Sequence, residues 1–164
     1  MPVNFWVRLC KENLVFSAAH FITFDGNTCE RLHGHNYRVA AYVFGPLDEN
    51  EYVVDFIALQ DSLKAVLEEL DHHMLLPTEH RLIHVEISGG EVEVRFEGRR
   101  WLFPREDCAL LPMANTTAER LAWHIGTRLL DRLHSETGRR PQKVRIEVDE
   151  NFGQWAACEL SVES

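Results

Sequence analysis

The chain has 164 residues, 45% of them hydrophobic, and its 26 acidic and 17 basic residues give a net charge of −9. This length and apolar content favour one folded domain, spanning residues 1–164, over a disordered chain. The acidic balance disfavours a nucleic acid partner, because phosphate binding needs a basic surface. No apolar run is long enough to cross a bilayer, so we expect a cytoplasmic, soluble protein with no membrane partner.

The N-terminal part of the chain predicts two strands. Residues 3–16 place apolar side chains at every second position, which is typical of a strand, and the apolar run that follows ends at His20. A loop rich in turn residues comes next. Residues 35–44 then predict the second strand, which Gly45 and Pro46 close.

The next segment predicts a helix that begins at Asp55. Asp55 is a suitable N-cap, and the residues after it repeat apolar side chains at helical spacing up to Leu70. We expect this helix to end near residues 70–73. Residues 83–88 and 92–96 alternate on either side of two glycines, and 101–104 extend the pattern, so we interpret residues 78–112 as a β-hairpin insertion.

The last third predicts a second helix and two strands. The helix begins at Thr116 or Thr117, since Thr116 and Glu119 match a capping box, and Gly138 ends it. Residues 143–148 and 155–162 predict the last two strands. This order of elements fits an α+β domain with both helices on one face of an antiparallel sheet.

Histidines and a cysteine gather ahead of the second strand. His33 and His35 are two residues apart, so their side chains point to the same face of a strand, and His20 ends the preceding run. Three neutral imidazoles with an open fourth position are typical of catalytic zinc, and the nearby Cys29 thiol could act as a base. The alternative is a surface His-Gly-His turn beside an unrelated cysteine.

Six motifs follow one another in a fixed order along the chain. They are Phe16–His20, Cys29–Tyr37, Val53–Phe56, Leu70–His72, Asn115–Glu119 and Glu150–Trp155. This series resembles the 6-pyruvoyl-tetrahydropterin synthase / 6-carboxytetrahydropterin synthase family. The resemblance covers nearly the whole chain except the insertion.

The resemblance implies the tunnelling fold (T-fold), with a four-stranded antiparallel sheet and two helices. It also implies a homo-oligomer, a trimer or hexamer, with active sites at subunit interfaces. A Zn²⁺ ion would be held by His20, His33 and His35, and the substrate would be the small molecule 7,8-dihydroneopterin triphosphate.

The same resemblance assigns catalytic roles to three residues. Cys29 resembles the general base, and Asp71 and His72 resemble the pair that completes the proton relay. Without the resemblance, Asp71 and His72 would be interpreted as residues that cap a helix end and compensate its dipole.

Four residues resemble the family's pterin pocket. Glu150 resembles the carboxylate that anchors the pterin ring, with a turn carboxylate as the alternative. Thr116, Thr117 and Glu119 fall in the segment that lines the pocket, although Glu119 is first a capping-box residue.

The spacing Cys-x3-His-Gly-His resembles the bacterial 6-carboxytetrahydropterin synthases, which feed 7-deazaguanine (queuosine) biosynthesis. Animal synthases have Cys-x5-His-Gly-His, and a folate-linked group has a glutamate two residues from His-Gly-His instead of the cysteine. We therefore expect a zinc-dependent lyase that makes 6-carboxytetrahydropterin. The alternatives are a 6-pyruvoyl-tetrahydropterin synthase, an aldolase-like enzyme, and a non-catalytic zinc-stabilised pterin-binding protein.

Overall fold

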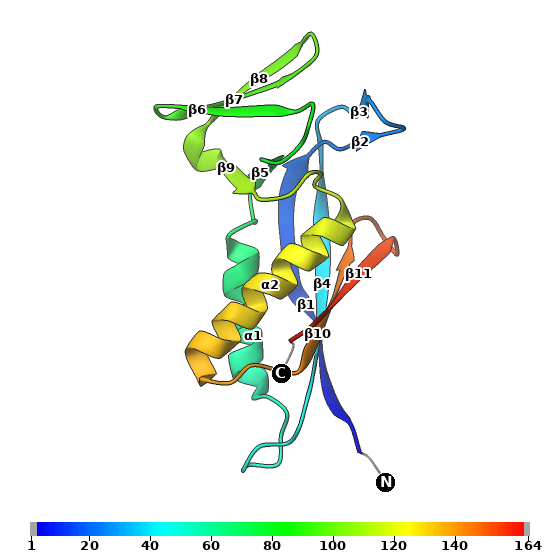
Figure 1. Ribbon diagram of the computed structural model, residues 1–164, viewed down its shortest axis with the longest axis vertical. Helices are drawn as coiled ribbons and strands as arrows, with labels where there is room; N and C mark the ends of the chain where they lie inside the picture. Colours follow the sequence, from blue (N-terminus) through cyan, green and yellow to red (C-terminus); the bar gives the residue numbers. More distant parts are fainter. Residues whose placement is uncertain (1–2, 163–164) are drawn as a thin grey trace.

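The computed structural model describes residues 3–162, in which both helices cover one face of a long twisted sheet (Figure 1). The sheet has six strands in the order β11-β10-β4-β1-β5-β9. Its members are β1 (Phe5–His20), β4 (His33–Gly45), β5 (His73–Pro77), β9 (Cys108–Leu111), β10 (Lys143–Asp149) and β11 (Trp155–Ser161). A separate hairpin pairs β2 (Thr23–Phe24) with β3 (Thr28–Cys29).

The four strands predicted from the sequence form the antiparallel part of the sheet. β1 pairs with β4, β4 with β10, and β10 with β11, each antiparallel. Two further strands, which the sequence did not predict, extend this antiparallel sheet by parallel pairing: β5 lies beside β1, and β9 lies beside β5. These two strands were missed because each is a short apolar run, whose periodicity does not distinguish a strand from the end of a helix.

The two helices are those that the sequence predicts, with one change at a helix start. α1 (Phe56–Glu68) has Asp55 as its N-cap, whose side chain accepts hydrogen bonds from two backbone N–H groups of the first turn at 2.9 Å. α2 (Ala118–Thr137) has Thr117 as its N-cap and ends at Gly138, whose φ is +71°. The capping box of Thr116 and Glu119 is therefore wrong, and Thr116 is left free for another contact.

The main hydrophobic core lies between the sheet and the two helices. The register of β1 and β4 shows that the three histidines lie on this same face of the sheet. Phe16 lies opposite Tyr37, Ala18 opposite His35, and His20 opposite His33. Directly paired residues of an antiparallel ladder point to the same face. The histidines therefore continue the helix-covered face beyond the end of its apolar core.

The insertion is a three-stranded antiparallel sheet at one end of the molecule (Figure 1). It contains β6 (His84–Ser88), β7 (Glu91–Phe96) and β8 (Arg99–Pro104), followed by a short 3-10 helix at Arg105–Asp107. The predicted hairpin and its extension are thus confirmed. A second small core fastens the insertion to the domain; its buried members include Phe21, Met74, Leu76, Val92, Val94 and Phe96.

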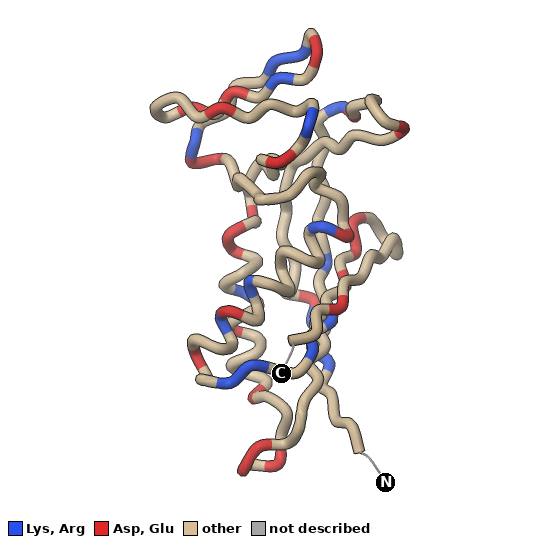
Figure 2. The backbone as a smooth tube through the Cα atoms, in the orientation of Figure 1, with Lys and Arg blue, Asp and Glu red and all other residues tan. Residues whose placement is uncertain are grey.

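Acidic and basic residues are interspersed along the chain, on the helices and the strands alike (Figure 2). No helix within residues 3–162 combines the length and apolarity needed to cross a membrane.

Candidate metal centre

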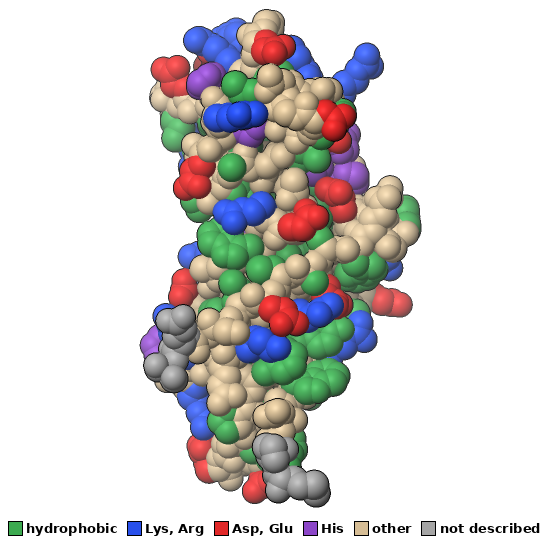
Figure 3. All heavy atoms as spheres, turned by 45° about the vertical axis from the view of Figure 1, so that its right-hand side comes forward, with side chains coloured by type: hydrophobic (Ala, Val, Ile, Leu, Met, Phe, Trp, Pro, Cys, Tyr) green, Lys and Arg blue, Asp and Glu red, His purple; other side chains and the backbone are tan. Residues whose placement is uncertain are grey.

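The three predicted metal ligands come together where β1 ends and β4 begins. One ligand atom from each of His20, His33 and His35 lies within 4.8 Å of the others. Their ring centroids are 4.8–5.2 Å apart. Histidine and acidic side chains meet at the surface just below the insertion (Figure 3). His20 itself is buried, while His33 and His35 are more open.

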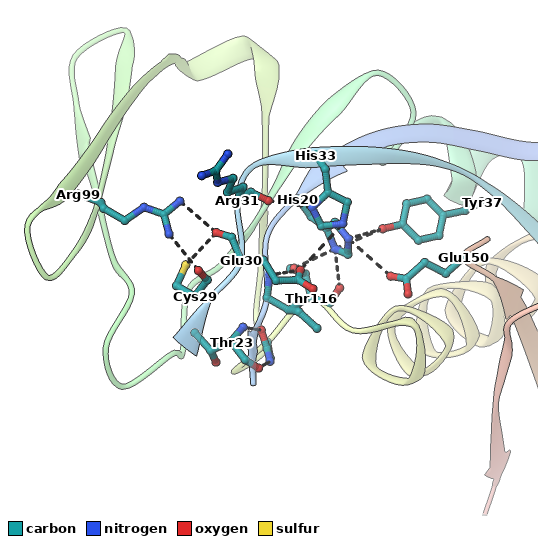
Figure 4. Close-up of polar contacts among 12 residues, drawn as sticks. His20, Thr23, Cys29, Glu30, Arg31, His33, Tyr37, Arg99, Thr116 and Glu150 are labelled. Atoms are coloured by element: carbon teal, nitrogen blue, oxygen red, sulfur yellow. Dashed lines mark hydrogen bonds and ion pairs between the residues drawn. The ribbon is translucent and has the colours of Figure 1, made fainter. Parts of the chain in front are cut away.

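Backbone carbonyls fix the tautomer of two of these rings. The Nδ1–H of His20 donates to the carbonyl of Thr116 at 2.9 Å, and the Nδ1–H of His33 donates to the carbonyl of Arg31 at 2.8 Å (Figure 4). A carbonyl only accepts, so each Nδ1 carries the proton and each Nε2 keeps its lone pair. Histidine ligands of metals are oriented in this way, with the N–H of the other ring nitrogen held by a carbonyl or carboxylate.

Burial favours the neutral form of His20. It lowers the pKa of His20 to about 4, opposed by the Thr116 hydrogen bond and supported by the neighbouring imidazoles His33 and His35. Burial also lowers the pKa of His35, with His33 adding to the effect. Neutral imidazole is the form that binds a metal, and three imidazoles are a donor set that suits Zn²⁺.

Tyr37 is a site residue to which sequence reasoning gave no role. Its hydroxyl lies 3.2 Å from both ring nitrogens of His20, and its ring stacks on Phe16 at 4.6 Å. Burial raises the pKa of Tyr37, so it is a neutral hydroxyl beside His20. The available signal was its position two residues after His35, on the same face of β4.

Glu150 reaches the metal centre from the turn between β10 and β11. Its Oε1 lies 3.5 Å from Nε2 of His20. Burial and the nearby Glu30 raise the pKa of Glu150, with Glu119 making a smaller contribution in the same direction. A half-buried carboxylate at this point can accept hydrogen bonds from a ligand that lies against the histidines.

The three residues of the predicted pocket segment have different environments. Thr116 is fully buried, and its carbonyl and hydroxyl both face His20. Thr117 uses its hydroxyl to cap α2, while Glu119 is exposed on the first turn. The segment therefore supports the metal centre through Thr116, which sequence reasoning had placed in the substrate pocket.

Cys29 lies in β3, beside the metal centre. Its thiol donates to the carbonyl of Glu30 at 3.5 Å, and within residues 3–162 it makes no hydrogen bond to a histidine. Burial raises the pKa of the Cys29 thiol, and the cation of Arg99 opposes that rise. In Figure 4 the sulfur lies on the side of the loop that faces Arg99.

Glu30 is a second candidate for the general base, and no role was assigned to it from the sequence. Its Oε2 lies 3.9 Å from Nε2 of His33 and accepts the backbone N–H of Ile22 at 3.2 Å. Two residues separate Glu30 from His33, which is the spacing of the glutamate in the folate-linked group. That spacing was the signal that could have drawn attention to Glu30 beside Cys29.

The Asp71–His72 pair forms, and within residues 3–162 no hydrogen bond or ion pair joins its side chains to the three histidines. Nδ1 of His72 lies 2.9 Å from Oδ2 of Asp71, whose Oδ1 accepts the N–H of Ser17 at 2.7 Å. Although burial opposes it, the hydrogen bonds from Ser17 and His72 lower the pKa of Asp71. His72 lines a cavity of about 620 Å³ together with His35 and with Ser17 and Asn36, which lie on the sheet face that carries no helix. Within residues 3–162 the pair thus shares a cavity with one candidate ligand but is not bonded to it.

Comparison with known families places these residues in context. A family model described as 6-pyruvoyl tetrahydropterin synthase matches residues 9–161. The chain belongs to the 6-pyruvoyl tetrahydropterin synthase family. Similar proteins are named tetrahydropterin synthases, so this chain is an enzyme of that family.

Two relatives of this synthase-family chain share the 6-carboxy name. A Methanocaldococcus jannaschii protein, provisionally assigned as a 6-carboxy-5,6,7,8-tetrahydropterin synthase, is 33% identical over 144 residues, which cover 87% of this chain and 88% of that protein. The 6-carboxy-5,6,7,8-tetrahydropterin synthase of Aquifex aeolicus is 30% identical over 118 residues, which cover 70% and 66% of the two chains.

Two similar solved structures carry the 6-pyruvoyl name. That of the Plasmodium falciparum 6-pyruvoyl tetrahydropterin synthase has a TM-score of 0.88 and 29% identity, covering 97% of this chain and 99% of that one. That of the Plasmodium vivax enzyme has the same TM-score and 26% identity, covering 98% and 100%; it is a variant whose glutamate, described as a catalytic residue, is replaced by alanine. These likenesses show that the synthase-family chain has the tunnelling fold.

Proposed function

We propose that this family member is a zinc-dependent lyase that converts 7,8-dihydroneopterin triphosphate into 6-carboxy-5,6,7,8-tetrahydropterin. The observation that carries the proposal is the group of three imidazoles, two of them with Nδ1–H bound to a backbone carbonyl. His20, His33 and His35 would hold Zn²⁺, which when bound supplies a Lewis acid that acidifies C–H groups next to a coordinated hydroxyl or carbonyl.

Glu150 is the residue that would orient the pterin. A carboxylate can accept two parallel N–H bonds, and the pterin offers its amino group and an adjacent ring N–H. Because Oε1 of Glu150 lies 3.5 Å from His20, a pterin bound there would have its side chain directed at the metal centre. The residue would thus fix the orientation of the ring against the reacting carbons.

Cys29 is the proposed base that removes a proton from the substrate side chain. It can do so only as a thiolate, which burial disfavours and the Arg99 cation favours. Glu30 is the alternative base, because its carboxylate lies 3.9 Å from His33 and because a glutamate is described as a catalytic residue in the similar Plasmodium vivax enzyme.

Asp71 and His72 are the proposed partners that return a proton. Imidazole can both accept and donate a proton, and Asp71 fixes the ring through its contact with Nδ1 at 2.9 Å. Because no hydrogen bond or ion pair joins this pair to the histidines of its own chain, we propose a homo-oligomer, a trimer or hexamer, in which His72 of the partner subunit completes each site. The exposure of His72 and the helix-free sheet face around it support this arrangement.

The 6-carboxy product is proposed because the relatives with 33% and 30% identity carry that name. It would serve the 7-deazaguanine (queuosine) pathway. The alternative is a 6-pyruvoyl-tetrahydropterin synthase, the name of the similar solved structures, in which the side chain is kept after triphosphate is eliminated. A non-catalytic zinc-stabilised pterin-binding protein is the remaining alternative.

Zinc content and turnover, measured together on the wild type and His33→Ala, test this proposal. About one zinc per chain, with metal and turnover both lost in the variant, is the expected result. Unchanged turnover in a His33→Ala protein that binds no metal would contradict it.

A further inference from the structure

The insertion touches the loop that carries both candidate bases. Arg99, the first residue of β8, donates from Nη1 to the carbonyl of Cys29 and from Nη2 to the carbonyl of Glu30, each at 3.0 Å (Figure 4). Two consecutive peptide groups are thus bound by one planar guanidinium. Such a two-point contact restricts orientation more than a single hydrogen bond does.

The guanidinium is itself held against the domain by aromatic packing. Its Cζ lies 4.6 Å from the ring centroid of Trp101, and that ring stacks on Phe21 with centroids 4.6 Å apart. Phe21 is buried and follows the metal-centre residue His20 directly. Arg99 therefore connects the base-carrying loop to the residue beside the first histidine.

Asn115 holds both backbone groups of Thr23, and Arg81 donates to the carbonyl of Gly26, so the start and tip of the hairpin have contacts of their own. The end of the hairpin at Cys29 and Glu30 has fewer. The N–H of Glu30 donates to the carbonyl of Ile22 at 2.9 Å, and the N–H of Ile22 donates to the Glu30 side chain. The strands β2 and β3, which pair in the same region, have two residues each. A hairpin this short has few bonds of its own, so a contact from outside decides how rigid it is.

We propose that Arg99 is a positioning residue of the active site, and that the insertion is the element that supplies it. By holding the carbonyls of Cys29 and Glu30, Arg99 fixes the backbone that carries both side chains. The Glu30 carboxylate lies 3.9 Å from Nε2 of His33, while the Cys29 sulfur faces Arg99. Only side-chain rotation is then needed to present either group to a bound substrate. This inference rests on the proposed function, which gives Cys29 or Glu30 the role of base.

The charge of Arg99 adds a second effect. A guanidinium next to a thiol stabilises the thiolate, which is the reactive form of cysteine. Lysine would retain the charge but has one donor atom instead of a fork, so it would restore thiol reactivity better than it restores the rigidity of the loop.

The test compares Arg99→Gln and Arg99→Lys with Arg100→Gln. Arg100 is the next residue of β8, is exposed, and binds Glu93 within the insertion, so it is a matched control that does not touch the site. Three quantities are measured on the full chain: amide hydrogen exchange at Glu30, the alkylation rate of Cys29 by iodoacetamide, and kcat with KM. Far-UV circular dichroism verifies that each variant is folded.

We expect Arg99→Gln to speed exchange at Glu30 by about tenfold, because two charge-assisted hydrogen bonds are lost. Cys29 alkylation should slow and kcat should fall with KM little changed, while Arg99→Lys recovers alkylation and Arg100→Gln matches the wild type. The inference would be overturned if, in a folded Arg99→Gln protein, the Glu30 amide exchanged and Cys29 was alkylated at the same rates as in the wild type. These two measurements do not depend on turnover, so they test the role of Arg99 even if the wild type does not convert the pterin. Absence of conversion would reject only the proposed function.

Discussion

The carbonyl of Thr116 accepts the Nδ1 proton of His20 at 2.9 Å, joining the residue before the cap of α2 to the last residue of β1. This contact satisfies Nδ1 of a buried imidazole and places the lone pair of the ring on Nε2. The stability of the fold and the form of the metal centre are therefore linked through one hydrogen bond.

The metal-free protein should lose stability as the pH falls from 6.5 toward 4. The pKa of His20 is about 4 in the folded protein and near 6.5 when unfolded, so the unfolded chain binds more protons in this window and stability rises with pH. Between pH 7 and pH 5 the contribution of His20 to the loss of unfolding free energy should be about 2 kcal/mol. Urea unfolding at the two pH values measures it.

His20→Asn is the matched variant for this pH effect, because its amide can still donate to Thr116 but does not titrate. The free energy of unfolding of this variant should differ less between pH 7 and pH 5 than that of the wild type. An equal difference in both proteins would show that His20 is not the responsible group.

Zinc should stabilise the wild type and leave His35→Ala unaffected. Binding only to the folded chain adds about 2.7 kcal/mol at a free concentration a hundred times Kd, which raises Tm. His84→Ala is the control, since His84 is an exposed residue of the insertion. A zinc-dependent rise of Tm in His35→Ala equal to that of the wild type would place the metal elsewhere.

Cys29→Ala should lower kcat by roughly 10²- to 10⁴-fold, the contribution of a general base, with zinc content unchanged. Glu30→Gln should retain more activity than Cys29→Ala, because the amide keeps the size of the side chain and can still pack against Ile22. Steady-state kinetics of the two variants decide between them. The reverse order would make Glu30 the base.

Mixing Cys29→Ala and His72→Ala should restore activity that neither variant has alone. If each site takes Cys29 from one subunit and His72 from another, random exchange of equal amounts yields about a quarter of the sites intact. Turnover after exchange, compared with the unmixed proteins, is the measurement. No recovery despite demonstrated subunit exchange would mean that one chain contains both residues of its site.

Much of this fold follows from local patterns in the sequence. Alternation along β1 and β4, the cap at Asp55 and the stop at Gly138 predicted the elements, and the spacing of His33 and His35 predicted their common face. The resemblance then supplied the assembly of His20 with them. At these positions the local preferences of the residues agree with the tertiary structure, so the local patterns predict the elements correctly.

The parts that could not be predicted depend on contacts distant in sequence. The carbonyl of Thr116 meets His20 across 96 residues, and Arg99 meets Cys29 across 70. A backbone carbonyl has no sequence signature, and an arginine in an insertion has no periodic partner. β5 and β9 could not be predicted for the same reason: β5 pairs with β1 and β9 pairs with β5, and these pairings are decided by the sheet, not by the residues of the two strands.

Product analysis of the zinc-loaded protein with 7,8-dihydroneopterin triphosphate tests the central claim most directly. Mass spectrometry should find 6-carboxytetrahydropterin together with acetaldehyde, in amounts that depend on zinc. Accumulation of 6-pyruvoyltetrahydropterin without acetaldehyde, or no conversion by protein that holds zinc, would contradict the account.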